Sequence, residues 1–441
     1  MHCVGTFRLR SSAVAALSAF AVFAAAQPAR AATLVSETTW GGAVSEVVGD
    51  AAVASDGSTY LAGFTTSFAT NQTAIFVVKF APDGTLTWQR TWDAVAAFSN
   101  DEARDVAIAP DGSVYVTGSA LGVAGDVVLL KLSQNGDLVW QQRWGGAGSE
   151  SGEAVAVAAD GSVYVAGGTN SFGDGGSHFF ALKFTPDGTL VWQRIRAGGT
   201  AQVVDVAPDG SVAVAGVGAR PDLPGAFDAV VLKLDAGGAL AWQRAYFAGE
   251  VTDARGGVAV SADGSIHVAG AIQDSERKLV VDALLFRLSA SGSLLWDRTW
   301  GGRSGDVSSG IAIAPDGAVL WSGDTNSFGA GSDDAFVLFV SADGKALDGA
   351  TWGGAGIEHG DGVGAAPNGT VSLGATAETP PFTFQRAPTK TARARGTVAT
   401  PETPLADAAG TVVDAGGTLA TSDGTTPGAG GFDAALVRVS R

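Results

Sequence analysis

Carboxylates recur at a fixed distance before a repeated turn signal. Ten residues separate each acid from the Asp-Gly, Asn-Gly or Gly-Gly pair that follows, and six of eight such positions are acidic. Oxygen ligands of this kind suit Ca²⁺ or a cationic ligand. A polar residue repeated in most units more often accepts hydrogen bonds from its own loop, and we favour that interpretation. The six acids are Glu46, Asp101, Glu150, Asp253, Asp306 and Glu358.

A second polar series and one histidine add to the residues that could do chemistry. His359 lies between Glu358 and Asp361 in a segment that we expect to be a loop, and it is the best candidate for metal binding or acid–base work. A solvated loop histidine is the more common case, because catalysis needs several unlike groups held together. The second series stands nine residues before another set of turns and comprises Asp126, His178, Asp228, Asp282, Asp334 and Asp433.

A repeat of about 52 residues must position these groups. An aromatic residue or its replacement recurs at positions 40, 92, 144, 196, 246, 300 and 352. Two turns recur in each unit, as in Asp111-Gly112 and Asn135-Gly136, between short stretches of alternating apolar residues. Such pairs between alternating stretches predict tight hairpins. Each unit therefore predicts four strands, with the tight turns on one face and the longer Gly-rich loops on the other.

Four-stranded units of this length are typical of a β-propeller. Trp144-Gly145-Gly146 and the run from Ala159 to Gly167 resemble the bacterial extracellular β-propeller repeats known as SBBP. The resemblance covers essentially all of residues 33–441 and implies an all-β fold with a single propeller. It implies no particular activity, because such repeats serve many roles. The segment Pro82–Trp88 is similar to the tryptophan-docking motif of quinoprotein propellers.

The turn series predicts eight four-stranded blades, because the first kind of turn occurs eight times, the last at Gly416-Gly417, and the second seven times, the last and weakest at Arg395-Gly396. The N-terminal strand Thr33–Trp40 matches the fourth strand of a unit, and Phe432–Val439 matches a third strand. We therefore expect the N-terminal strand to complete the C-terminal blade and close the ring. Residues 353–404 have lost both aromatics and carry several prolines, which indicates a degenerate blade. A ring of seven blades is the alternative.

The first 31 residues predict a secretory signal peptide, followed by the propeller over 32–441. Two arginines precede the apolar run Ala13–Ala26, and Ala29-Arg30-Ala31 supplies the small-x-small cleavage pattern. We expect cleavage after Ala31, with Ala26 as the alternative. The run is too short to span a bilayer, so we expect an exported protein, periplasmic or extracellular, with no membrane span. Removal of three arginines changes the net charge from −17 to −20, and the only cysteine leaves as well.

The net charge and the absence of known catalytic motifs argue against several classes of function. A net charge of −17 argues against a nucleic-acid partner, and the chain has no G-x-S-x-G, H-E-x-x-H or phosphate-loop pattern. We favour a monomeric, non-catalytic scaffold without a cofactor that binds a protein or a surface polymer at or beyond the cell envelope. One alternative is a hydrolase or lyase with an acidic site on the long-loop face, where Ca²⁺ is the ion to test. The other is a quinoprotein-like dehydrogenase.

Overall fold

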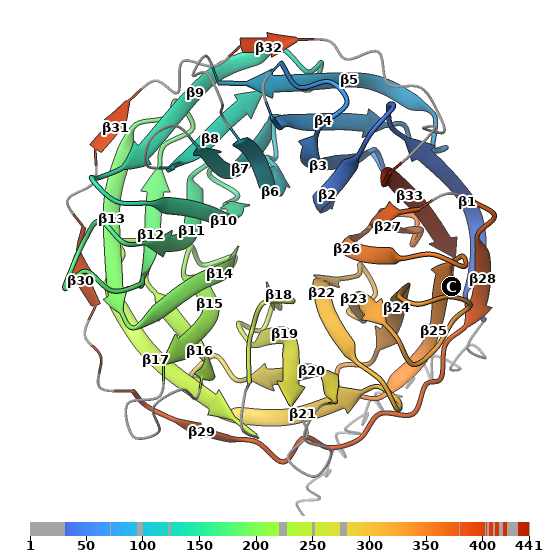
Figure 1. The fold of residues 1–441 in the computed structure, drawn as a ribbon. Coiled ribbons are helices and arrows are strands. Elements are labelled where there is room, and N and C mark those ends of the chain that lie inside the picture. Colours follow the sequence, from blue (N-terminus) through green and yellow to red (C-terminus); the bar gives the residue numbers. More distant parts are fainter. Residues whose placement is uncertain are drawn as a thin grey trace, which may run out of the picture.

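The computed structural model describes residues 31–440, apart from 71, 95–99, 122–124, 220–226, 249–251, 274–279, 379, 402, 404, 409–410, 414–417 and 421–430. These residues form seven antiparallel sheets around a central channel (Figure 1). The predicted signal peptide lies outside the described residues, except for Ala31. The described part of the chain has no helix long and apolar enough to cross a membrane. The seven sheets confirm the predicted all-β propeller.

Blades 1 to 3 each use four consecutive strands, with the first strand next to the channel and the fourth at the rim. Blade 1 contains β2 (Glu46–Val53), β3 (Thr59–Thr65), β4 (Ala74–Phe80) and β5 (Leu86–Asp93). Blade 2 contains β6 (Asn100–Ile108), β7 (Val114–Leu121), β8 (Asp126–Leu132) and β9 (Leu138–Gly145). Blade 3 contains β10 (Glu150–Val157), β11 (Val163–Thr169), β12 (His178–Phe184) and β13 (Leu190–Ala197).

Blades 4 to 6 repeat this order. Blade 4 contains β14 (Gly199–Val206), β15 (Val212–Ala219), β16 (Phe227–Leu234) and β17 (Leu240–Phe247). Blade 5 contains β18 (Gly257–Val260), β19 (Ile266–Gln273), β20 (Val281–Leu288) and β21 (Leu294–Trp300). Blade 6 contains β22 (Asp306–Ile313), β23 (Val319–Thr325), β24 (Asp334–Val340) and β25 (Ala346–Gly353). Every residue of β4 and β24 is buried, because both faces of a blade are covered by its neighbours.

Blade 7 corrects the prediction of eight blades. Its sheet has the order β26 (Glu358–Ala365), β27 (Val371–Ala377), β33 (Asp433–Ser440) and β1 (Thr33–Trp40). The predicted closing blade is wrong in composition, because its two inner strands come from residues 358–377 and not from residues close to the C-terminus. The turn expected at Gly416-Gly417 lies outside the described residues. Arg395-Gly396 is not the predicted hairpin, since the Gly396 amide donates to Asp297 of blade 5 (2.6 Å).

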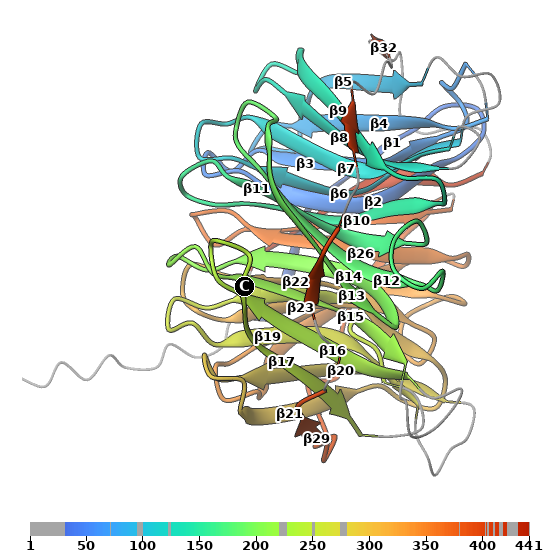
Figure 2. The same ribbon diagram turned by 90° about the vertical axis from the view of Figure 1, so that its left-hand side faces the viewer.

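The chain between β27 and β33 runs around the rim and adds a short antiparallel strand to one blade after another. We call the described residues from Thr383 to Ala420 the belt. The belt pairs with the outermost strands of blades 6, 5, 4, 3, 2 and 1 in that order (Figures 1 and 2). Residues 353–404 are therefore not one degenerate blade, because they supply two strands of blade 7 and then the first part of the belt. The belt pairs β28 (Thr383–Arg386) with β25, Ala392 with Thr299, β29 (Thr397–Ala399) with β17, β30 (Leu405–Asp407) with β13, β31 (Thr411–Val413) with β9, and β32 (Thr418–Ala420) with β5.

A β-bulge interrupts the innermost strand of most blades. The pairing of β6 with β7 shifts between Ala103 and Asp105, so that Arg104 is the extra residue. A bulge bends the strand and changes the direction in which the following side chains point. The bulges therefore decide which polar side chains face the channel. The other extra residues are Gly49, Glu153, Gln202, Ser309 and Asp361.

Candidate functional site

The six predicted carboxylates lie at the start of the innermost strands, on the face that carries the long loops. All six are at most 7% exposed, so they are enclosed by the loops. Four of them are the first residues of their strands: Glu46 in β2, Glu150 in β10, Asp306 in β22 and Glu358 in β26. Asp101 is the second residue of β6, and Asp253 precedes β18.

Three of these carboxylates share one pattern of hydrogen bonds with their own loops. Glu150 accepts from the Gly146 amide (2.8 Å) and from the Thr169 hydroxyl (2.7 Å). The bonds join the loop that enters a blade to the far end of its second strand, and charge-assisted bonds of this kind are strong. The corresponding partners are Gly42 and Thr65 for Glu46, and Gly302 and Thr325 for Asp306.

Members of the second polar series lie beside members of the first. A Cβ atom added to Gly145 would stand 2.1 Å from Asp126 Oδ1 and 2.7 Å from Glu150 Oε2, so this glycine separates two carboxylates. Burial raises the pKa of Asp126, the Arg143 guanidinium 3.0 Å away opposes the shift, and Glu150 adds to it. The same arrangement surrounds Gly41, Gly301 and Gly353. A glycine is needed at these positions because a side chain would displace a carboxylate.

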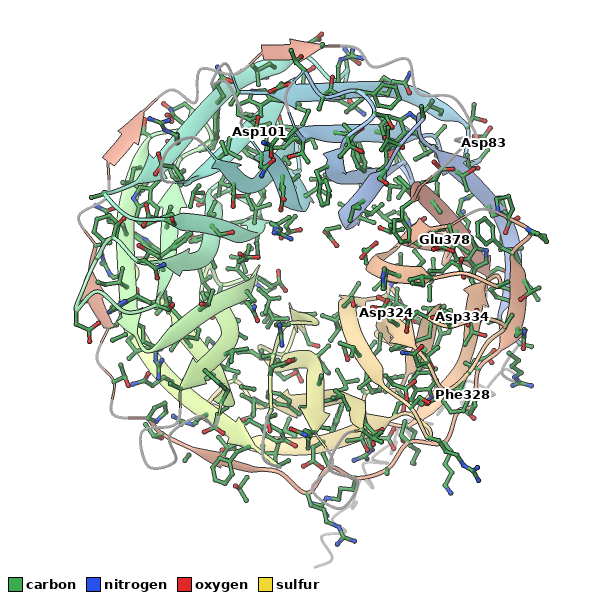
Figure 3. All side chains as sticks on the ribbon, in the orientation of Figure 1. Asp83, Asp101, Asp324, Phe328, Asp334 and Glu378 are labelled. Atoms are coloured by element: carbon green, nitrogen blue, oxygen red, sulfur yellow. The ribbon has the colours of Figure 1, made fainter. Side chains whose placement is uncertain are left out.

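Glu358 departs from this pattern. In the pairing of β26 with β27 it stands opposite Ala377, where Glu150 stands opposite Thr169. Its Oε2 accepts from the Gly354 amide (2.6 Å), and its buried Oε1 has no hydrogen-bond partner among the described residues. Burial raises the pKa of Glu358, and the carboxylates of Asp334 and Glu378 add to the shift. Asp334 and Glu378 are labelled in Figure 3.

His359 and Asp361 lie in strand β26, so the expectation of a loop there is wrong. The His359 Nδ1 is 3.2 Å from Asp324 Oδ2 of blade 6, and this contact is the main reason that the pKa of His359 rises to about 9. Burial raises the pKa of Asp361 well above its usual range, although the Thr376 hydroxyl donates to it (2.8 Å). Sequence reasoning missed Asp324. The signal was an acid beside Thr325, at the position where blades 1 and 3 have Phe64 and Gly168.

Three further acids line the channel, in a cavity of about 600 Å³ formed by the innermost strands. Asp105 accepts from the Val106 amide (2.7 Å) of its own strand and from the Val155 amide (2.6 Å) of blade 3. Asp205 bridges blades 4 and 5 in the same way. Burial raises the pKa of Asp205 to about 6. Burial also raises the pKa of Asp50 well above its usual range, and the neighbouring Asp105 adds to that shift. Asp50 and Asp105 directly follow bulges, which the apolar alternation of the sequence does not reveal.

A second cavity of about 570 Å³ opens on the long-loop face between blades 3, 4 and 5. Its polar wall includes the Asp253 carboxylate, whose Oδ2 pairs with Arg255 Nε (3.1 Å) and whose Oδ1 accepts from the Ala271 amide (2.9 Å). Gln202 lines the same cavity, and its buried Oε1 has no partner among the described residues. The apolar wall is formed by Val217, Ala219 and Phe227, the last 42% exposed.

This cavity occurs where the carboxylate pattern fails. Blade 4 has Gly199 at the position of Glu150, with a φ of +139°. A Cβ atom there would lie 2.1 Å from the Val217 carbonyl oxygen, so no acid fits. Among the predicted acids, Asp253 lines this cavity. No sequence pattern indicated the cavity, or Arg255 and Phe227 in its lining. In the described part of the chain, no three His, Cys, Asp or Glu side chains are grouped to hold a metal ion.

Comparison with known proteins agrees with this architecture. Residues 54–86 and 158–190 match a family described as a beta-propeller domain of unknown function, DUF5122. Both stretches run from the first tight turn of a blade to the start of its fourth strand, in blades 1 and 3. The chain is a β-propeller repeat protein. No curated protein matches it.

Solved structures similar to this propeller are distant from it. The WD40 domain of Pan2 from Neurospora crassa is 10% identical with a TM-score of 0.48, over 79% of this chain and 93% of that one. The periplasmic gluconolactonase PpgL of Pseudomonas aeruginosa is 14% identical with a TM-score of 0.41, over 68% and 83%. A protein of unknown function from Bacteroides caccae is 14% identical with a TM-score of 0.35, over 59% and 81%. Similarities at this level carry no argument about function.

Proposed function

We propose that this propeller is an exported, non-catalytic binding protein of the SBBP type, which holds a surface polymer at or beyond the cell envelope as a monomer. The observation that carries the proposal is the 570 Å³ cavity between blades 3, 4 and 5, where unlike polar groups face an apolar wall. Its volume falls in the usual range of ligand sites. The predicted acids of the other blades are buried and accept hydrogen bonds from their own loops, which favours this cavity over those acids as the binding site.

The chemistry of the walls favours a polymer rich in hydroxyl groups. Two nitrogens of the Arg255 guanidinium each lie 3.1 Å from Asp253 Oδ2, and 61% of the Arg255 side chain is exposed. Ser177 and Thr200 add hydroxyl groups to the lining of the cavity. The exposed ring of Phe227 offers an apolar surface to the face of a sugar ring. A polysaccharide has hydroxyl groups and ring faces that can contact all these groups. The test must distinguish a polysaccharide ligand from a protein partner.

Binding to soluble polysaccharides of different charge, measured by isothermal titration calorimetry on the mature protein, tests the proposal. We expect Phe227→Ala and Arg255→Ala each to weaken binding by about tenfold or more, the effect of losing one central contact. Leu295→Ala is the matched control, because Leu295 is 51% exposed on β21 of the outer rim. Binding that is unchanged in both cavity variants, or a protein partner captured equally by them, would contradict the proposal.

A hydrolase or lyase is the second candidate, and the contact between His359 and Asp324 favours it. An imidazole with a pKa of about 9 stays protonated at neutral pH and could donate a proton to a leaving group. Asp361, whose pKa is also raised, stands two residues away on the same strand. Release of reducing ends or unsaturated products from the same polysaccharides, with and without Ca²⁺, would favour this candidate if His359→Ala abolished it. Unchanged activity in His359→Ala would exclude this site as the source.

A further inference from the structure

On the tight-turn face, the seam between blades 6 and 7 differs from the five seams that precede it. In blades 1 to 5 a tryptophan of the outermost strand donates its indole N–H to a carbonyl in the second tight turn of the next blade. Trp296 of blade 5, for example, donates to the Ala342 carbonyl of blade 6 (2.9 Å). The others are Trp88, Trp140, Trp192 and Trp242, with distances of 3.0 to 3.2 Å.

Blade 6 has an acid at this position. Asp348 stands opposite Phe339 in the sheet, as Trp296 stands opposite Arg287 in blade 5. Two residues further on, Ala350 replaces an arginine that in blades 1, 3, 4 and 5 donates to a glycine carbonyl of the same turn. Both donors are lost together because, among the residues that the structure describes, no such turn joins the last two strands of blade 7. Its strands β33 and β1 come from the two ends of the chain.

A backbone donor takes the place of the missing turn carbonyl. The Ala32 N–H donates to Asp348 Oδ2 at 2.6 Å, just before Thr33 pairs with Ser440. The polarity of the seam is therefore reversed, with the acceptor on blade 6 and the donor on blade 7. Asp348 is 0% exposed, and its Oδ1 accepts from the Gly349 amide (2.9 Å) and lies 3.3 Å from Arg386 Nε of the belt.

Ala32 is also the residue that follows the predicted cleavage point. We propose that signal-peptide removal after Ala31 places the new α-amino group of Ala32 on Asp348, so that processing completes the seam between blades 6 and 7. The inference rests on export, and it is independent of the ligand. A signal peptidase hydrolyses the Ala31–Ala32 bond with one water molecule. The leaving peptide ends in the Ala31 carboxylate, and the Ala32 amine takes up a proton.

The charge of the new terminus explains why an acid stands here. A buried carboxylate needs charged or hydrogen-bonding partners, and an ammonium is a stronger partner than an amide N–H. Arg386 is 64% exposed, so it screens the carboxylate less effectively than a terminus held inside the seam. The mature terminus therefore fixes β1, the outermost strand of blade 7, at its first residue.

The intact mass of the exported protein gives the first test. We expect a chain that begins at Ala32. A chain that begins at Gln27, after the alternative site Ala26, would overturn the proposal, because the Ala32 nitrogen would then remain an amide. This result would leave the binding proposal intact, since export would still have occurred.

Thermal melts of three forms give the second test. We expect the chain starting at Ala32 to melt on the order of 1–3 °C above a chain that retains Arg30-Ala31 and above the same chain acetylated at Ala32. Asp348→Asn should remove the difference, and Asp343→Asn, in the exposed turn of the same blade, should preserve it. Acetylation leaves Asp348 unaltered, so it remains informative if Asp348→Asn does not fold. Equal midpoints for all three wild-type forms would overturn the proposal.

Discussion

The Trp144 indole of blade 2 donates a hydrogen bond to the Gln193 side chain of blade 3 over 2.8 Å. Both groups lie on outermost strands, and the indole itself is buried against Phe180 (4.7 Å between ring centroids). The same bond joins Trp40 to Gln89 and Trp92 to Gln141. These seams therefore combine a large apolar contact with one polar bond that fixes the register of neighbouring blades.

Trp144→Ala should lower the free energy of unfolding by about 3–5 kcal/mol, the range for removing a buried aromatic ring. Trp140→Ala should cost less, about 1–2 kcal/mol, because Trp140 is half-buried on the Gly188 turn of the next blade. Denaturant unfolding followed by tryptophan fluorescence measures both. Val139→Ala, at a residue that is 54% exposed, is the control and should change stability by less than about 0.5 kcal/mol. An equal loss for Trp140 and Trp144 would contradict this ranking.

Deleting Thr33–Trp40 should lower the thermal midpoint sharply. The deletion removes β1, exposes the edge of β33 and empties the place of the fully buried Trp40. A chain cut only before Ala32 is the control and should keep the full midpoint. Differential scanning calorimetry of both chains makes the comparison, and equal midpoints would show that β1 does not hold blade 7.

The buried carboxylates should give no calcium-specific stabilisation. Both oxygens of the Glu150 carboxylate already accept hydrogen bonds, from the Gly146 amide and the Thr169 hydroxyl, so an ion would add little stability. An ion that bound only the folded state would raise the melting temperature by mass action. Melts with millimolar Ca²⁺, against Mg²⁺ and ionic-strength controls, should therefore coincide. A rise specific to Ca²⁺ and abolished by Glu150→Gln with Asp101→Asn would instead assign these acids a binding role.

The regular blades could be predicted from the sequence, because each carries its own turns and aromatics. Asp160-Gly161 and Asp187-Gly188 mark the two hairpins of blade 3, and both glycines have the positive φ that such turns require. The belt could not be predicted. Its strands have only three or four residues, too few to show a period of two. Its prolines therefore suggested a degenerate blade.

The site was less predictable than the fold. The spacing identified Asp253 at the start of blade 5, yet the cavity beside it depends on Gly199 of blade 4, which appears in the sequence only as a missing acid. The pairing of His359 with Asp324 joins two blades through residues 35 positions apart. Contacts of this kind depend on the geometry of the seam, and the repeat pattern within one blade does not contain that information.

The contact between His359 and Asp324 should make stability depend on pH above neutrality. The pKa of His359 is about 9 in the folded protein, chiefly because of the Asp324 side chain, and about 6.5 in the unfolded chain. A raised folded-state pKa contributes stability that is fully present below pH 6.5 and is lost as the pH rises through 9. The thermal midpoint of the wild type should therefore fall toward that of Asp324→Asn between these values. Imidazole NMR signals measure the titration directly, with His267, which is 2% exposed and has a pKa lowered by burial to about 4, as the internal control. A His359 signal that titrates near 6.5 in both proteins would show that Asp324 does not hold its proton.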